Sequence, residues 1–193
     1  MTVKTETRLL TGCPELRATD TGRTLVGYAA VFNSPTDIGD AWTEVFLPGA
    51  FHRSFNDSIC ALIAHDRSRV LGRVGAGTLR LSEDSHGLRY EIDLPDTTDG
   101  RDLAVSVERG DITGMSFGFT ATRQMWDDTA NPPKRTISEA ALLEVTVTAF
   151  PAYPDTSVGL RSLDEARQER RDHPAKRRID ARRATMEQKF RGI

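Results

Sequence analysis

A six-residue stretch near the middle of the chain, Gly114–Phe119 with the sequence GMSFGF, alternates apolar side chains with small ones. In an extended strand successive side chains point to opposite faces, so Met115, Phe117 and Phe119 are expected on one face, with Ser116 and Gly118 on the other. Glycine adds no side chain, so a polypeptide can approach the serine closely on the second face. The stretch therefore predicts a strand with one core face, and Ser116 is either a nucleophile or an ordinary strand serine.

Two other stretches also have the character of strands. Residues 58–65 are apolar on both faces and end in His65, which Asp66 follows. Residues 139–150 are rich in β-branched side chains, which favour strands, and carry Glu144. Regular alternation places Leu142, Glu144 and Thr146 on one face of this strand and Leu143 with Val145 on the other. Glu144 thus lies away from the purely apolar face.

The rest of the chain predicts a mainly β protein with a few helices. The first 22 residues form an arm with one strand at most, and a charged segment with Asn131-Pro132-Pro133 predicts an exposed hairpin loop over residues 123–138. Helices are expected at 49–55, after Pro48, and at 101–109, before Gly110. Strands are expected at 24–32, 43–47, 58–65, 69–75, 77–82, 87–94, 114–119 and 139–150.

Length and charge divide the chain into a body and a tail. A chain of 193 residues that is 38% apolar is long enough for one sizeable core. Residues 160–193 carry 11 Lys/Arg against 6 Asp/Glu, whereas the rest of the chain carries 15 against 22. We therefore expect one folded domain over residues 1–159 and a basic, charged tail over 160–193, helical or disordered.

Composition also limits the function classes. There is no apolar run of about 18 residues and no apolar signal region at the start, which predicts an intracellular protein without a membrane span. Cys13 and Cys60 have no metal or redox spacing, and His65 has no second histidine at ligand spacing, so no cofactor and no metal is expected. The acidic body and the lack of an aromatic platform argue against nucleic-acid binding.

The order of these stretches, an apolar strand ending in His-Asp, then GMSFGF, then LLEVTVTAFPAYP, resembles the prohead (capsid maturation) serine proteases of HK97-type tailed phages. The resemblance runs from about Gly27 to Val158 and includes the segments GYAAVF, FLPGAF and RVLGR. These proteases resemble the herpesvirus assemblins in fold. The resemblance thus implies a closed antiparallel β-barrel of the herpesvirus-protease type, followed by the charged helical tail.

A serine hydroxyl is a weak nucleophile, so a protease needs a base beside it and a group that orients the base. Of the four histidines, only His65 ends a buried strand, and the resemblance assigns His65 as base and Ser116 as nucleophile. No histidine follows Ser116 before the tail, so the third member must be a carboxylate. Glu144 matches the position of the acidic member in the family, with Glu139 and Asp66 as the alternatives.

The resemblance implies a serine endopeptidase that is packaged in the immature procapsid within the host cytoplasm, or that is encoded by a prophage in a bacterium. Inside the procapsid it would cleave the scaffolding segment of the major capsid protein and then itself, with self-cleavage near residues 153–163 releasing the tail. The related herpesvirus enzymes work as dimers, which leaves a homodimer open. The alternative function is a noncatalytic capsid-assembly or scaffolding module on the same barrel, in which Ser116 and His65 only pack.

Overall fold

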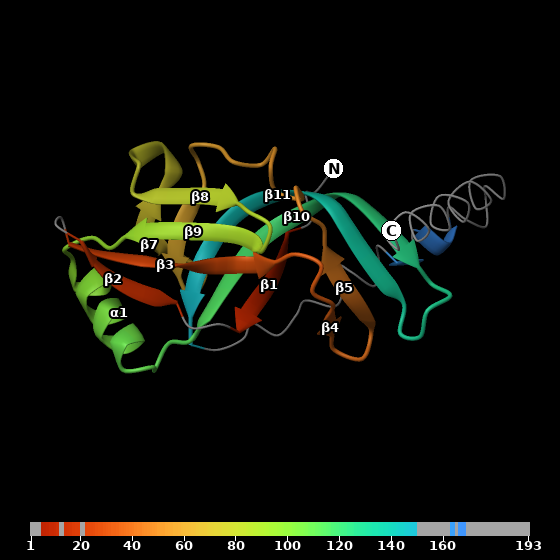
Figure 1. Cartoon of the computed structure of the whole chain (residues 1–193), viewed down its shortest axis with the longest axis horizontal. Helices are drawn as coiled ribbons and strands as arrows, with labels where there is room; N and C mark the ends of the chain where they lie inside the picture. The colour runs from red at the N-terminus through yellow and green to blue at the C-terminus, as the bar shows by residue number, and fades with distance from the viewer. Residues whose placement is uncertain (1–4, 12–13, 20–21, 150–162, 165, 169–193) are drawn as a thin grey trace. The chain divides into compact units, whose positions relative to one another are not determined.

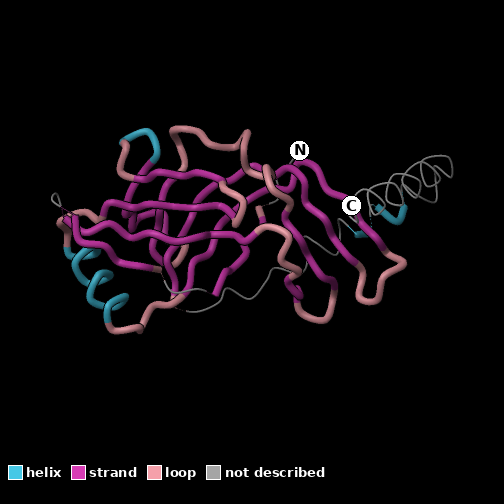
Figure 2. Tube along the Cα trace, in the orientation of Figure 1, coloured by secondary structure: helices cyan, strands magenta, loops and turns pink. Residues whose placement is uncertain are grey.

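The structure, a computed structural model, describes residues 5–11, 14–19, 22–149, 163–164 and 166–168. The chain divides into two compact units, Met1–Asp155 and Thr156–Ile193. The described residues of the first unit are mainly β, with one α-helix and one 3-10 helix (Figures 1 and 2). The predicted domain boundary at residue 159 lies outside the described residues and stays a prediction, as does most of the predicted tail helix, of which 163–164 and 166–168 are helical.

The larger sheet has seven strands, and its centre is formed by two long antiparallel strands, β10 and β11. β1 pairs antiparallel with β10, on the edge of β10 opposite to β11. The other side of β11 is shared by β5 and β6, which both run parallel to it, and β4 and β7 extend the sheet beyond them. The strands are β1 (Glu6–Thr11), β4 (Thr36–Ile38), β5 (Trp42–Phe46), β6 (Cys60–Ile63), β7 (Asp66–Arg73), β10 (Gly114–Asp127) and β11 (Lys134–Thr148).

The smaller sheet has four antiparallel strands in the order β2-β3-β9-β8. These are β2 (Glu15–Thr19), β3 (Gly22–Val31), β9 (Gly87–Asp93) and β8 (Leu79–Glu83). The short helix η1 (Val74–Ala76) links β7 to β8, and α1 (Thr98–Glu108) links β9 to β10. Thr97 caps α1 by accepting a hydrogen bond from the Gly100 N–H, and α1 buries Leu103 and Ala104.

The predicted closed antiparallel barrel is wrong for the described part of the chain. The described strands form two open sheets, and no strand of one sheet pairs with a strand of the other. The pairing is also mixed, because β11 has parallel neighbours over both of its halves. Alternation in sequence predicts strands and their faces, but it contains no information on which strands pair or whether the sheet closes.

Three local predictions also need correction. The arm holds two strands, β1 and β2, where one at most was expected. Residues 49–55, predicted as a helix, contain turns and no helix, and the Ser54 N–H donates to the Phe51 carbonyl. The predicted loop over 123–138 is shorter, since β10 continues to Asp127 and β11 begins at Lys134.

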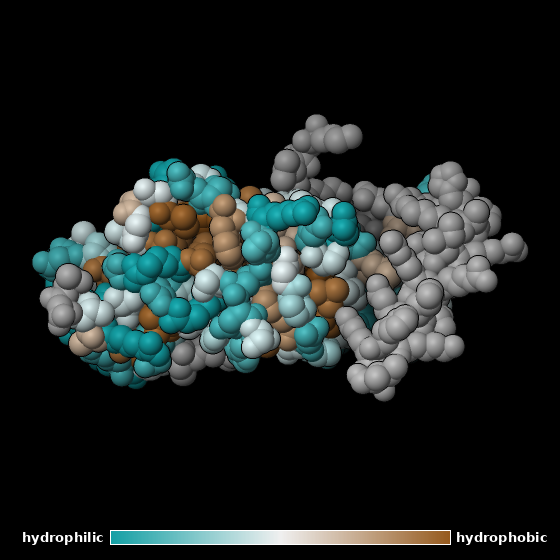
Figure 3. Space-filling view, turned by 45° about the horizontal axis from the view of Figure 1, so that its top comes forward, coloured by the Kyte–Doolittle hydropathy of each residue, from teal (hydrophilic) through white to brown (hydrophobic). Residues whose placement is uncertain are grey.

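Apolar side chains from both sheets form one core. An aromatic cluster lies at its centre, where Phe46 contacts Phe51, Phe117 and Phe119 with ring centroids 5.2–5.5 Å apart. Met115, Phe117 and Phe119 are buried in this core, as the alternation of GMSFGF predicts. In Figure 3 hydrophilic side chains dominate the visible surface and apolar ones gather in separate patches. No helix in the described ranges has the length and apolar character that a membrane span needs.

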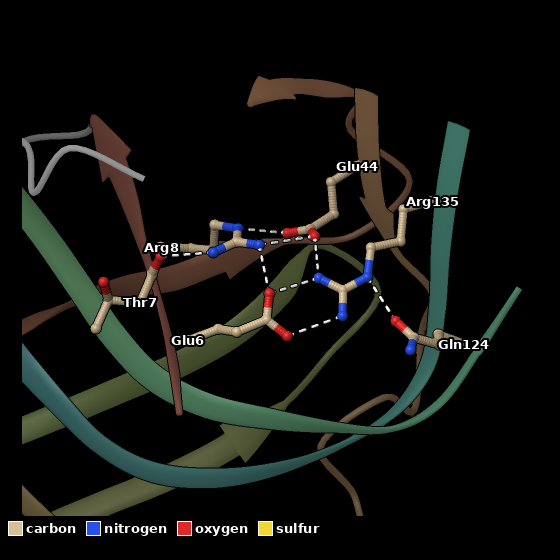
Figure 4. Close-up of polar contacts among 6 residues, drawn as sticks. All are labelled: Glu6, Thr7, Arg8, Glu44, Gln124 and Arg135. Atoms are coloured by element: carbon tan, nitrogen blue, oxygen red, sulfur yellow. Dashed lines mark hydrogen bonds and ion pairs between the residues drawn. The ribbon is translucent and has the colours of Figure 1, made fainter. Parts of the chain in front are cut away.

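A buried ionic network holds β1 in place (Figure 4). Arg135 of β11 bonds Glu6 of β1 at 2.6 Å and Glu44 of β5 at 2.8 Å, and Arg8 of β1 bonds Glu44 at 2.6 Å. Burial alone would raise the pKa of Glu6, but the hydrogen bonds and charges of Arg135 and Arg8 together outweigh it and hold this pKa below its usual value. The network therefore ties β1 to the far side of the sheet, and β1 in turn flanks the strand that carries Ser116.

Candidate active site

Ser116, Glu144 and His65 come from neighbouring segments of the larger sheet. Ser116 lies on β10 opposite Thr146 of β11, and Glu144 lies on β11 opposite Gly118 of β10. Directly opposite residues share a face of a sheet, so the Ser116 and Glu144 side chains are on the same face. β6 pairs with the same part of β11, and His65 follows its last residue by two positions.

His65 reaches this face through a left-handed turn. Ala64 and His65 have φ angles of 50° and 60°, a conformation that costs a non-glycine residue about 1–2 kcal/mol. β11 holds both residues of the turn, because the Ala64 N–H donates to the Val147 carbonyl and the His65 N–H donates to Thr146 Oγ1, each at 2.9 Å. The turn ends the alternation of β6 and redirects the His65 ring.

The ring of His65 lies against the carboxylate of Glu144. Nδ1 of His65 is 2.7 Å from Oε1 of Glu144, and the two side chains are 28% and 17% exposed. A carboxylate that accepts the Nδ1–H fixes the tautomer in which Nε2 has the free lone pair. Nε2 is then the nitrogen that can act as a base.

A β-bulge at Leu143 changes the faces of the residues that precede Glu144 on β11. Gly118 pairs with Glu144, but the next residue of β10, Phe119, pairs with Leu142, so Leu143 is the extra residue. Leu142 is buried in the core and the Leu143 side chain is 38% exposed. The predicted faces of these two leucines were therefore wrong, because the bulge reverses the alternation between Leu142 and Val145.

Gly118 leaves the space that Glu144 occupies. A Cβ atom at Gly118 would lie 2.8 Å from Oε1, 3.2 Å from Cγ and 3.4 Å from Cδ of Glu144. The first of these distances is shorter than real Cβ contacts. The glycine of GMSFGF thus lets the acidic side chain reach across β10, a role different from the open approach to Ser116 that the sequence suggests.

Three buried polar atoms gather at this site without a hydrogen-bond partner in the described part of the chain. They are Oγ of Ser116, Nε2 of His65 and Oε2 of Glu144. Buried polar groups are normally satisfied, so three such atoms together suggest a site that a polar group of another molecule fills. Ser116 and His65 are not bonded to each other here, and catalytic hydrogen bonds often form only in the complex with substrate.

The two alternative carboxylates have other partners. Glu139 forms an ion pair with Arg123 at 3.0 Å. Asp66 accepts hydrogen bonds from the Ser68 hydroxyl and the Ser68 N–H, which lower the pKa of Asp66. Among the described residues only the Glu144 carboxylate is hydrogen-bonded to the His65 ring, so the geometry favours Glu144 over these two as the orienting acid. Within the described ranges no group of His, Cys, Asp and Glu side chains is arranged to hold a metal ion.

Sequence reasoning missed one residue of this site. Thr146 is fully buried, lies opposite Ser116 and accepts the His65 N–H, yet the sequence predicted only that it shares a face with Glu144. Its position two residues after the acid is the signal that was available.

Comparison with known proteins shows which family the chain belongs to. The model of the Caudovirus prohead serine protease family matches residues 13–169, which is most of the chain. The chain belongs to this family. The prohead protease of Enterobacteria phage HK97 is 29% identical to it over 141 residues, or 72% of this chain and 60% of the phage protein. The chain thus matches less than two thirds of that relative's length.

No solved structure matches the chain significantly. The predicted likeness to herpesvirus assemblins therefore stays a prediction.

Proposed function

We propose that this member of the prohead serine protease family is an endopeptidase of phage capsid maturation, with Ser116 as nucleophile, His65 as general base and Glu144 as orienting acid. The observation that carries the proposal is the 2.7 Å contact between His65 Nδ1 and Glu144 Oε1, which leaves Nε2 free on the face where Ser116 Oγ also lacks a partner. Family membership supports the same reaction class.

The reaction then follows the general serine protease sequence. Oγ of Ser116 attacks the carbonyl carbon of the scissile peptide bond while Nε2 of His65 takes the hydroxyl proton. The imidazolium is stabilised by Glu144 through Nδ1–H, and it gives the proton from Nε2 to the leaving amine as the C–N bond breaks. In the second half Nε2 of His65 takes a proton from water as the water attacks the acyl-enzyme carbonyl carbon. It then returns that proton to Oγ of Ser116 as the acyl C–O bond breaks.

The strand arrangement limits how substrate can bind. β10 is paired with β1 on one side and with β11 on the other, so a substrate cannot extend the sheet beside Ser116 while both are in place. We expect the substrate peptide to cross the face of the sheet at Ser116.

The proposed substrates are the scaffolding segment of the major capsid protein and the chain itself, inside the procapsid. We also propose that the chain cleaves itself near residues 153–163, which releases residues 160–193. A homodimer is the proposed oligomeric state. Most of the cleavage region lies outside the described residues. The tail is basic whereas the rest of the chain is acidic, and this difference in charge supports the proposal that the tail is released as a separate segment.

Co-expression with the major capsid protein of the same phage tests the function. Wild type, Ser116→Ala and the control Ser138→Ala are compared by intact mass. Ser138 is a serine of β11 whose hydroxyl donates to the Arg123 carbonyl. We expect both proteins to be shortened with wild type and Ser138→Ala and to stay whole with Ser116→Ala. Assembled procapsids without cleavage by any version would favour the noncatalytic assembly module, and cleavage by Ser116→Ala would exclude Ser116 as nucleophile.

A further inference from the structure

Thr146 connects the three groups of the proposed active site. It is two residues after Glu144 on β11, directly opposite Ser116 on β10, and its Oγ1 accepts the backbone N–H of His65 at 2.9 Å. Its exposed fraction is 0%, so water does not compete for this hydrogen bond. One buried hydroxyl thus joins the strand of the acid to the backbone of the base.

The backbone of His65 needs such a partner. β6 ends at Ile63, and the left-handed φ angles of Ala64 and His65 take both residues out of the regular ladder. The Ala64 N–H still finds a backbone acceptor, the Val147 carbonyl, but the His65 N–H depends on a side chain. The acceptor is fully buried and the hydrogen bond itself is partly buried, so losing the Thr146 oxygen would leave the His65 N–H without this partner and would favour a different conformation of the turn.

Threonine suits this task better than a flexible polar residue. Its β-branch restricts χ1, so the position of Oγ1 is defined by the backbone of β11. The same strand places Glu144, whose Oε1 contacts His65 Nδ1. β11 therefore fixes the positions of both the backbone and the ring of His65.

We propose that Thr146 is a positioning residue that holds the left-handed turn of His65, so that Nδ1 stays on Glu144 and Nε2 stays directed to the site of Ser116. Its effect on catalysis rests on the proposed function, whereas its effect on the His65–Glu144 contact does not.

Nuclear magnetic resonance tests the structural part. The Nδ1–H proton of His65, bonded to Glu144, is followed in wild type, Thr146→Val, Thr146→Ser and the control Thr136→Val. Thr136 is a half-buried threonine of the same strand, far from the turn. We expect the protected Nδ1–H signal in wild type, Thr146→Ser and Thr136→Val, and its loss in Thr146→Val. A protected signal in folded Thr146→Val would overturn the proposal.

Thr146→Ala is measured alongside, because it removes the same oxygen without placing a methyl group beside His65. If Thr146→Val does not fold, retention of the Nδ1–H signal in Thr146→Ala overturns the proposal and its loss supports it.

Kinetics with a peptide substrate test the catalytic part. A misplaced base lowers kcat more than it raises KM, and a displacement near 1 Å reduces the rate on the order of 10²-fold. We expect a loss of that order in kcat for Thr146→Val, with rescue by Thr146→Ser. Equal losses in both variants would contradict positioning through the oxygen. If wild type shows no activity, the proposed function fails while the magnetic resonance result still decides the role of Thr146.

Discussion

Substituting Gly118 by alanine changes the candidate site by a single methyl group. The new Cβ would lie 2.8 Å from Oε1 of Glu144, whereas ordinary contact begins at 3.4 Å. Glu144 would have to withdraw, and its Oε1 would no longer stay 2.7 Å from His65 Nδ1. Because the φ angle of Gly118 is not positive, alanine fits the backbone itself, and a strand alanine is more favourable than glycine by about 0.5–1 kcal/mol.

We therefore expect Gly118→Ala to fold normally and to lose activity. Displacements below 1 Å in an active site reduce rates by roughly 10- to 100-fold, equivalent to about 1.4–2.7 kcal/mol of transition-state stabilisation. The assay is kcat/KM on a peptide substrate, with the melting temperature measured on the same samples.

A double-mutant cycle identifies the cause of the loss. In a Glu144→Ala background the carboxylate is already gone, so Gly118→Ala should have no further effect on kcat/KM. Full activity of Gly118→Ala, or the same loss in both backgrounds, would refute the reasoning that Gly118 acts by leaving space for Glu144.

Three further predictions concern charged groups. Glu144→Gln should lower kcat about 10³- to 10⁴-fold, as a wrong histidine tautomer does in other triads, whereas Glu139→Gln should not, and similar kinetics for the two variants would contradict the assignment. Arg135→Met leaves Glu6 and Glu44 buried without their shared partner and should reduce the free energy of unfolding by about 3–5 kcal/mol in urea, and a loss below about 1 kcal/mol would contradict the role of the network. The pKa of Glu6 is lower in the folded protein than its ordinary 4.5, so its ionisation stabilises the fold above that pH and less below it. The stability difference between wild type and Glu6→Gln should therefore shrink as the pH falls below about 4.5, and a difference that grows would have the wrong sign.

The faces of β10 were predictable from sequence because its alternation is regular. Met115 and Phe117 are in the core and Ser116 is on the other face, as GMSFGF predicts. β11 was not fully predictable, because the bulge at Leu143 has no clear signature in a run of apolar and β-branched residues. Glu144 was still placed on the correct face, since the alternation from Glu144 to Thr148 is unbroken.

Features that depend on pairing between distant segments could not be predicted. The left-handed turn at Ala64 and His65 has no glycine to indicate it, and it is held by contacts to β11. The burial of Arg135 depends on Glu6, 129 positions earlier in the chain. Taken by itself, the segment around Arg135 has the composition of an exposed loop, although it forms the start of the long strand β11.

The central claim, that Ser116 is a nucleophile activated by His65 and Glu144, is tested most directly by a serine-reactive fluorophosphonate probe followed by peptide mapping. The account predicts one adduct on Ser116 in wild type and in Ser138→Ala, strongly slowed labelling in His65→Ala and Glu144→Gln, and no adduct in Ser116→Ala. Labelling of Ser116 at the same rate in His65→Ala, or an adduct that persists in Ser116→Ala, would contradict it.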